Sequence, residues 1–428
     1  MQTSLAPFIK DTPEGREADA ILRKCTHCGM CTATCPTYQL LNDELDGPRG
    51  RIYLIKQVLE GATPTARTQL HLDRCLTCRA CETTCPTGVR YGRLADIGRH
   101  LVEERVPRGL AASAWRGALD TVISNASLFG PLLRLGQLAR PLLPSALKRK
   151  VPPGFAPEDG WPTTEHARRV IVLEGCVQPS LSPATNAAAA RVLDRLGISL
   201  VRAAGAGCCG GVSFHLNKQE KALDTMRRTI DAWWPHIERG VEAIVIAASG
   251  CGVTVKEYGH YLAQDPAYAA KAKRVSDLAK DLSEVISSES AKLRALTSHQ
   301  PVLSEVEGSR VTSHRRVAFH SPCTLQHGMK LKGAVESVLT TLGFQLTPVP
   351  DAHLCCGSAG TYSILQPELS QRLLADKIAA LESGMPASIL TANIGCQVHL
   401  QTATPLPVRH WIEALDDTLA RASPGTLR

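Results

Sequence analysis

The sequence predicts a fold of class α + α/β, with a small helical N-terminal domain followed by two tandem α/β modules. Two repeats lead to this prediction: a short cysteine motif that occurs twice before residue 87, and a longer pattern of strands, helices and cysteines that occurs twice after residue 168. Repetition of this kind indicates duplicated structural units. We expect a cluster domain at 1–110, a helical connector and linker at 111–168, modules at 169–290 and 316–428, and a flexible insertion at 291–315.

The short motif has the form C-x-x-C-x-x-C-x-x-x-C-P in both copies. The first runs from Cys25 to Pro36 and the second from Cys75 to Pro86. This is the bacterial ferredoxin spacing for two [4Fe–4S] clusters, in which three thiolates share one cluster and the fourth ligates the other. We therefore expect one cluster on Cys25, Cys28, Cys31 and Cys85, and the other on Cys75, Cys78, Cys81 and Cys35. Two zinc sites are the alternative, although zinc needs four ligands and no trailing Cys-Pro.

Composition narrows the class of protein. The chain has 428 residues, of which 44% are hydrophobic and 21% charged, as in an ordinary soluble protein. Its sixteen cysteines, with no apolar segment at the N-terminus, indicate a reducing compartment and metal ligation rather than disulfides. The net charge is +8 and the basic residues are dispersed along the chain, which argues against nucleic-acid binding. No apolar run is long enough to span a membrane.

The N-terminal region reads as helical. A short helix is expected at residues 15–24, and 39 residues separate the two motifs, more than a compact two-cluster ferredoxin uses. Pro48 suits a helix start, Ile52, Ile55 and Leu59 follow at helical spacing, and Gly61 is a stop signal. Another helix is expected from Pro86 to about residue 106. The pattern favours a helical ferredoxin type over a β-hairpin type.

Two arginines begin the helix after Pro48. Arg49 and Arg51 have two interpretations: they contact an acidic partner or tune a cluster, or they form a solvated first turn, which we favour.

Residues 110–150 are expected to be mixed helix. The apolar stretch 128–150 is punctuated by Arg134, Arg140 and a basic end. It fits a helix lying on a membrane surface or a partner subunit, and it fits a helix packed on its own protein, which we favour. The Pro/Gly-rich residues 151–168 mark a domain boundary.

Each module reads as strand, helix, strand, Cys-Cys-Gly, helix, strand and cysteine, which predicts a parallel α/β sheet. Examples in the first module are a strand over 169–176, a helix over 186–196 and a buried strand over 243–247. The cysteines fall at or just after strand ends, where α/β folds gather ligands. Four cysteines per module suffice for a metal, a cluster or a redox pair, and buried packing thiols are the alternative. They are Cys176, Cys208, Cys209 and Cys251, and Cys323, Cys355, Cys356 and Cys396.

Taken together, these features resemble the iron–sulfur subunits of glycolate oxidase (glycolate dehydrogenase). The resemblance spans nearly the whole chain: both ferredoxin motifs, the segment from Asp43 to Gln57, Trp233-Trp234-Pro and both Cys-Cys-Gly modules. It implies an electron-transfer subunit that holds two [4Fe–4S] clusters and no flavin. FAD-binding partner subunits would oxidise glycolate to glyoxylate, and this chain would pass electrons to a membrane acceptor, a quinone. Because the sequence has no membrane span but the stretch 128–150 is apolar and basic, we expect the protein to be held peripherally on the cytoplasmic face of the inner membrane.

Relatives with the same architecture supply alternatives. These are the iron–sulfur subunits of D-lactate and anaerobic glycerol-3-phosphate dehydrogenases, and a heterodisulfide-reductase-like enzyme acting at the Cys-Cys-Gly modules. The last of these carries a C-x-x-C where this chain has Cys251-Gly-Val-Thr and Cys396-Gln-Val-His399, which puts a non-cubane cluster in doubt here. His399 is a candidate substitute ligand in the second module. Gly205-Ala-Gly-Cys-Cys-Gly does not fit the dinucleotide-binding motif, so no nicotinamide or flavin site is expected.

Overall fold

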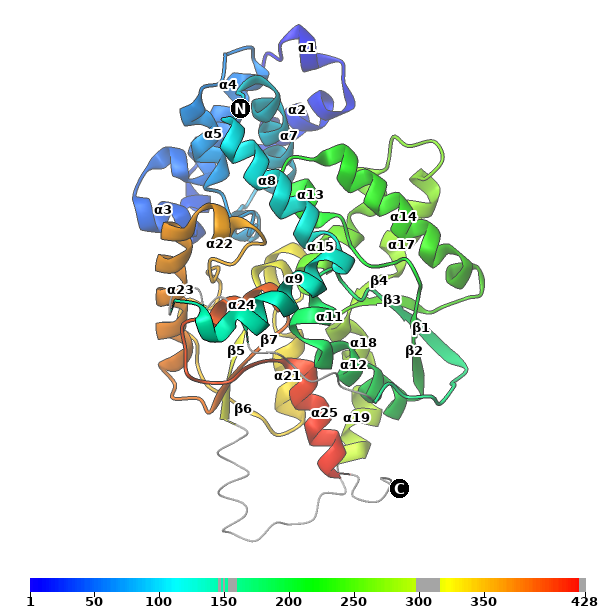
Figure 1. The fold of residues 1–428 in the computed structure, drawn as a ribbon. Helices are drawn as coiled ribbons and strands as arrows, with labels where there is room; N and C mark the ends of the chain where they lie inside the picture. The colour runs from blue at the N-terminus through cyan, green and yellow to red at the C-terminus, as the bar shows by residue number, and fades with distance from the viewer. Residues whose placement is uncertain (145–147, 149–150, 153–159, 298–315, 423–428) are drawn as a thin grey trace.

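The computed structural model describes residues 1–144, 148, 151–152, 160–297 and 316–422. Figure 1 shows a helical N-terminal domain resting on two α/β modules, with the connector helices α8 and α9 running across both. This arrangement confirms the predicted fold class.

The N-terminal domain is built from short helices, and helices α1 to α5 begin at prolines or capping threonines. Thr12 caps α2 by accepting a hydrogen bond from the Gly15 amide, Pro48 opens α4, and Thr65 and Thr68 form a capping box at α5. Helices α2, α4 and α7 bury their apolar faces against one another. The elements are α1 (Pro7–Lys10), α2 (Pro13–Lys24), η1 (Met30–Thr34), α3 (Pro36–Leu41), η2 (Glu44–Asp46), α4 (Pro48–Leu59), α5 (Ala66–Asp73), α6 (Ala80–Thr84) and α7 (Tyr91–Arg105).

The connector consists of α8 (Leu110–Ile123), α9 (Ala126–Ala139) and the single turn η3 (Arg140–Leu142). Helix α8 is fastened to the first module through Asp120. This fully buried carboxylate accepts hydrogen bonds from Ser213 and Lys221, at 2.5 and 2.6 Å. Helix α9, by contrast, buries none of its residues.

The first module is a parallel four-stranded sheet of order β2-β1-β3-β4 with helices on both faces. The central strand β3 is apolar and buried throughout, and β1 is so over its last three residues, as expected where both faces are covered. The elements are β1 (Arg168–Val172), α11 (Gln178–Leu181), α12 (Pro183–Arg195), β2 (Ile198–Arg202), α13 (Gly211–His215), α14 (Gln219–Glu238), β3 (Ala243–Ile246), α15 (Ser249–Lys256), α16 (Tyr258–Tyr261), α17 (Ala269–Leu278), β4 (Ala279–Asp281), α18 (Leu282–Ser288) and α19 (Ser290–Thr297).

The second module repeats this sheet in the order β6-β5-β7-β8. Strand β5 occupies the place of β1, and β7 the place of β3. The elements are β5 (Arg316–His320), the π-turn η4 (Thr324–Gly328), α21 (Ala334–Thr341), β6 (Gln345–Leu346), α22 (Tyr362–Leu365), α23 (Pro367–Glu382), β7 (Ser388–Thr391), α24 (Ile394–Gln401), β8 (Val408–His410) and α25 (Trp411–Ala422).

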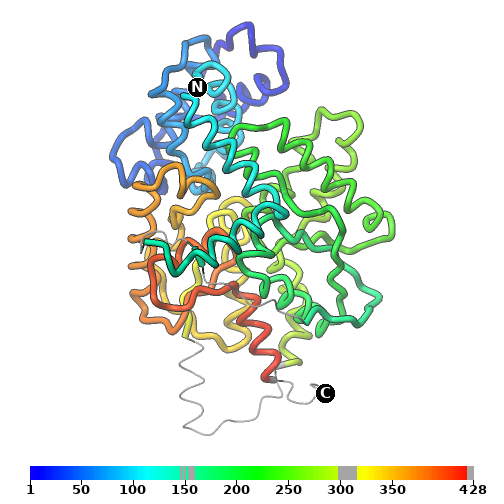
Figure 2. The backbone as a smooth tube through the Cα atoms, in the orientation of Figure 1, coloured from blue at the N-terminus to red at the C-terminus, as the bar shows by residue number. Residues whose placement is uncertain are grey.

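The two modules share one hydrophobic core. Buried residues of β1 and α12 belong to the same apolar cluster as those of β5, α21 and α25. The red C-terminal helix α25 lies beside the green helix α12 in Figure 2, and Asp416 accepts hydrogen bonds from Arg191 and Arg195 there, each at 2.7 Å. The modules therefore form one packed body.

The predicted flexible insertion at 291–315 differs from the structure at its start. Residues 290–297 form helix α19, and its Leu293 is buried in the shared core, which explains why this segment is ordered. The rest of the insertion, 298–315, lies outside the described residues, as do 153–159 of the predicted linker.

Candidate metal centres

Four cysteines line one cavity at the outer end of the N-terminal domain. They are Cys25, Cys28 and Cys31 from the first motif and Cys85 from the second, and Cys81 also borders the space. The loop after α2 carries the first three, and Cys85 ends α6. The structure thus brings together the residues that the ferredoxin spacing grouped.

The complementary four cysteines line a second cavity deeper in the molecule. They are Cys75, Cys78 and Cys81 from the second motif and Cys35 from the first. Each crossed set of three cysteines and one thus lines one cavity, and Cys81 borders both cavities.

The two cysteine loops share a backbone conformation. His27 and Gly29 have positive φ in the first loop, and Thr77 and Arg79 have positive φ at the same positions of the second. Glycine adopts this conformation freely, whereas arginine does so at a cost. Arg79 is held by a bidentate ion pair to Glu257 of the first module, at 2.5 and 2.8 Å. The contact with the module therefore stabilises a strained cysteine loop.

Arg51 is enclosed beside the second cavity, with 1% of its side chain exposed. Its guanidinium donates to the His71 carbonyl at 2.7 Å, to Thr37 Oγ1 at 3.1 Å and to Asp46 at 3.4 Å. The solvated-turn interpretation is therefore wrong for Arg51. Arg49 is half-buried and pairs with Glu44 at 2.6 Å.

The charge around the second cavity favours thiolate at Cys75. Burial alone raises the pKa of this thiol, but the guanidinium groups of Arg51 and Arg99, followed by the Tyr91 hydroxyl, outweigh it and lower the pKa below its usual value. Around the first cavity, burial and the neighbouring thiols raise the pKa of Cys31 to about 11. Thiols crowded in this way become thiolates together only when a cation compensates them, which fits both cavities to metal-bound clusters.

The four cysteines of the first module converge beyond the ends of β1, β2 and β3. The Cys208 sulfur lies between the thiols of Cys176 and Cys209, which hydrogen-bond to it and lower its pKa, and Cys209 in turn contacts Cys251. The glycine that follows the pair, Gly210, has a φ of +82°, and a Cβ there would lie 2.9 Å from the Ala222 carbonyl. The Cys-Cys-Gly turn therefore requires glycine.

The second module gathers its four cysteines in the same way. The sulfurs of Cys323 and Cys355 lie 3.9 Å apart, and Cys356 contacts both Cys355 and Cys396. Gly357 has a φ of +87°, and a Cβ on it would lie 2.6 Å from the Ser370 carbonyl.

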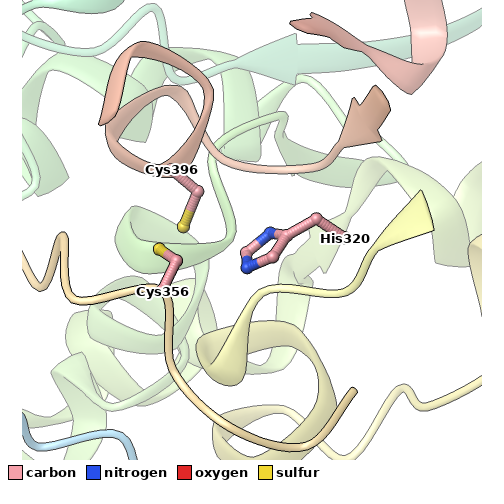
Figure 3. Close-up of side chains that lie close together, drawn as sticks. All are labelled: His320, Cys356 and Cys396. Atoms are coloured by element: carbon pink, nitrogen blue, oxygen red, sulfur yellow. The ribbon is translucent and has the colours of Figure 1, made fainter. Parts of the chain in front are cut away.

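One residue of this site was missed by the sequence analysis. His320, at the end of β5, lies with Cys356 and Cys396 so that one potential ligand atom of each falls within 4.8 Å of the others (Figure 3). Burial, followed by the charge of Lys377, lowers the pKa of His320 to about 3, so the imidazole is neutral. The candidate ligand His399 instead lies with Nε2 3.2 Å from Ser370 Oγ. The sequence does contain one signal for His320: it is a polar residue at the end of an otherwise apolar strand segment, Val317 to Phe319.

The second cavity and the thiols of the second module are neighbours. Cys78 packs with Cys323 and Cys355 in one apolar cluster that also contains Leu76 and Tyr362. Tyr362 donates to the Arg74 carbonyl at 3.2 Å across the same boundary. The first cavity, by contrast, opens near the surface, where Cys28 and Met30 are exposed.

Helix α9 and the turn after it present an exposed apolar side. Five leucines at spacings of three and four residues are exposed, three of them strongly, and Arg134 beside them is exposed too. They are Leu128, Leu132, Leu135 (63%), Leu138 (79%) and Leu142 (89%). The favoured interpretation of this stretch, a helix packed on its own protein, is therefore wrong for these leucines. Within the described ranges, no helix is long and apolar enough to cross a membrane.

Comparisons with known proteins agree with this organisation. A 4Fe-4S dicluster domain model matches residues 21–89, and a cysteine-rich domain model matches residues 170–256 and 317–401. The chain is 55% identical over 421 residues to the glycolate oxidase iron–sulfur subunit of Escherichia coli (strain K12), a match that covers 98% of this chain and 100% of that protein. It is 29% identical to the probable glycolate oxidase iron–sulfur subunit of Bacillus subtilis (strain 168), over 92% of this chain and 91% of the relative. Lactate utilization protein A of Bacillus licheniformis is 24% identical, over 58% of this chain and 99% of its own length.

Proposed function

The chain belongs to the family of glycolate oxidase iron–sulfur subunits, and from this premise we propose that it is the electron-transfer subunit of a glycolate dehydrogenase. FAD-binding partner subunits would oxidise glycolate to glyoxylate, and this chain would deliver the electrons to a quinone at the membrane. The 55% identity over nearly the full chain is the observation that carries the substrate assignment. The match to lactate utilization protein A is weaker and shorter, so lactate ranks second.

We assign two [4Fe–4S] clusters to the two cavities. Cys25, Cys28, Cys31 and Cys85 would hold the outer cluster, and the inner one would be held by Cys75, Cys78, Cys81 and Cys35. When bound, such clusters exchange single electrons, which divides the two-electron chemistry of a flavin into single steps. The support for the crossed assignment is that all four cysteines of each crossed set line the same cavity, with Cys81 bordering the other cavity as well.

The chain's own residues would give the two sites different tasks. The outer cavity lies where Cys28 and Met30 are exposed, so a partner subunit can approach it closely. The inner cavity is bordered by Arg51 and by Cys78, which packs against the second module. The charges of Arg51 and Arg99, together with the Tyr91 hydroxyl, stabilise thiolate at Cys75. We therefore propose that electrons enter at the outer site.

The exposed leucines of α9 and the following turn are proposed to hold the protein peripherally on the cytoplasmic face of the inner membrane. An apolar side flanked by basic residues suits an interfacial helix. The double variant Leu135→Gln/Leu138→Gln should bind anionic phospholipid vesicles several-fold more weakly in a flotation assay, whereas Leu70→Gln, an exposed leucine on α5, should not. Equal binding by all three proteins would exclude this mode of attachment.

Ligand assignment is tested by iron analysis and EPR of the anaerobically purified chain. About eight iron atoms per chain are expected from two cubanes. Cys31→Ser and Cys85→Ser should remove the same EPR signal, and Cys35→Ser the other, while Cys251→Ser in the first module leaves both. If Cys85→Ser and Cys35→Ser each removed the signal of their own motif, the crossed assignment would be wrong.

The electron-transfer role is tested by reconstitution. Alone, the chain with intact clusters should not reduce a dye with glycolate, and activity should appear once the flavin-bearing subunits are added. In the complex, Cys28→Ala should abolish quinone reduction while glycolate still bleaches the partner's flavin. Oxidation of glycolate by the flavin-free chain at a comparable rate would refute the proposal.

A further inference from the structure

Three side chains converge inside the second module from three different elements. His320 ends β5, Cys356 lies in the Cys-Cys-Gly turn, and Cys396 lies in the first turn of α24. All three are buried, and Figure 3 shows the imidazole ring directed toward the two sulfurs. One nitrogen and two sulfurs within 4.8 Å of one another form a compact donor set.

The surrounding structure orients these donors. His320 and Thr391 are paired across β5 and β7, and the Nδ1 atom of the ring lies 3.1 Å from Thr391 Oγ1, which leaves Nε2 for coordination. Asn393 Nδ2 donates to the Cys396 sulfur at 3.4 Å. Metal-bound histidines usually have such a partner on the second nitrogen, and bound thiolates accept such hydrogen bonds.

The spacing suits one ion better than a cluster. Two thiolates that each lie about 2.3 Å from one tetrahedral zinc ion are roughly 3.8 Å apart. This separation is compatible with the three donor atoms here, which all lie within 4.8 Å of one another. In a cubane each iron carries its own thiolate, so the sulfurs are spread more widely. We propose that the second module binds one zinc-class divalent ion through His320, Cys356 and Cys396, with the fourth coordination position left to water or a small ligand.

A buried lysine completes the charge balance. Lys377 is 3% exposed, its ammonium donates to the Asp351 carbonyl at 2.8 Å, and within the described residues it forms no ion pair with a carboxylate. It lies near Cys355 and Cys356. Two thiolates neutralise a divalent ion, and Lys377 then balances an anionic fourth ligand or a third thiolate nearby.

The first module lacks this donor set. In the repeat, Leu173 stands where the second module has His320, and it is buried directly after the end of β1. The equivalent cysteines, Cys209 and Cys251, are present. The inference therefore requires one such ion per chain rather than two, and it is independent of the two clusters of the N-terminal domain.

The test measures zinc and iron together in the full chain, purified anaerobically with its clusters intact. One zinc per chain is expected beside the cluster iron, with loss of the zinc in His320→Leu, which copies the first module, and in Cys396→Ser. The matched control Cys251→Ser, at the equivalent position of the first module, should keep it. Unchanged cluster absorbance and circular dichroism check that each variant is folded.

A second measurement needs no variant. Zinc-depleted protein titrated with Co²⁺ should show the intense visible d–d bands of a tetrahedral site and a thiolate-to-cobalt charge-transfer band, saturating at one ion per chain. Absence of any cobalt or zinc binding by the parent chain would overturn the proposal. So would retention of zinc in folded His320→Leu, or iron in place of zinc at this site.

Discussion

Replacing Arg51 by methionine should lower the reduction potential of the inner cluster. The guanidinium is fully enclosed and borders the same cavity as Cys35 and Cys75. At a separation of roughly 7 Å and an effective dielectric constant of about 20, one unit charge contributes about 2.4 kcal/mol. Because about 2.3 kcal/mol corresponds to ~100 mV for one electron, the potential should fall by on the order of 100 mV. The sign follows because a removed cation no longer stabilises the added electron.

The fold should tolerate this change. Asp46, which Arg51 contacts at 3.4 Å, keeps Arg74 at 2.8 Å and His71 at 3.1 Å, so the carboxylate is not left unpaired. Methionine fills most of the vacated volume. Arg51→Lys retains the charge and should leave the potential near that of the parent.

The assay is an anaerobic redox titration followed by EPR, with Arg49→Met as the matched control. Arg49 is half-buried, paired with Glu44 and close to the outer loop. Because the effective dielectric constant around Arg49 is near that of water, removing its charge should shift the reduction potential of the outer cluster by only about 25 mV. The reasoning would be refuted by an upward shift in Arg51→Met, or by a downward shift no larger than that of the control.

Three further predictions concern stability. Gly357→Ala should destabilise the protein by more than ~2 kcal/mol in urea unfolding, because the left-handed backbone and the close carbonyl both disfavour a Cβ; Gly333→Ala, with a similar φ and open space, should lose only about 1 kcal/mol. Glu257→Gln should lose about 2 kcal/mol by breaking a largely buried pair, against less than ~0.5 kcal/mol for exposed Glu165→Gln. Burial raises the pKa of Asp96 to about 6. The contribution of the Asp96 carboxyl group to the free energy of unfolding is complete below about pH 4 and disappears as the pH rises through 6. Asp96→Asn should therefore flatten the dependence of stability on pH over that range. An unchanged pH dependence would contradict this.

Much of the fold followed from two kinds of sequence regularity. The cysteine spacing predicted the two loops, because each loop is local and its geometry depends on few residues. The repeat predicted two parallel sheets, because the strands keep the same apolar pattern in both copies. The positions of Arg51 and of α9 could not be obtained in this way. Helical periodicity predicts which residues share one side of a helix. Only the tertiary arrangement decides whether that side is covered, as it is where Asp46 and Thr37 contact Arg51, or is exposed to solvent, as in α9.

His320 illustrates the same limit at the candidate metal site. In the sequence it stands 36 residues before Cys356 and 76 before Cys396, and nothing local connects the three. The parallel pairing of β5 with β7 places them together, because both strands end at one edge of the sheet. His399, the candidate substitute for the missing second cysteine, lies one turn along α24 and reaches Ser370 instead.

The two modules contact the N-terminal domain through different groups, which gives a physical reason for their divergence. The first module supplies Glu257, whose ion pair with Arg79 stabilises the strained second cysteine loop. The second supplies Cys323 and Cys355, which pack against Cys78 of the inner cavity. The thiols of Cys323 and Cys355 adjoin the inner cavity through Cys78, whereas Glu257 acts on it through Arg79, which borders that cavity. Duplicated sites under such different constraints are free to diverge in their donors, and the exchange of Leu173 for His320 lies in the module whose thiols adjoin the inner cavity.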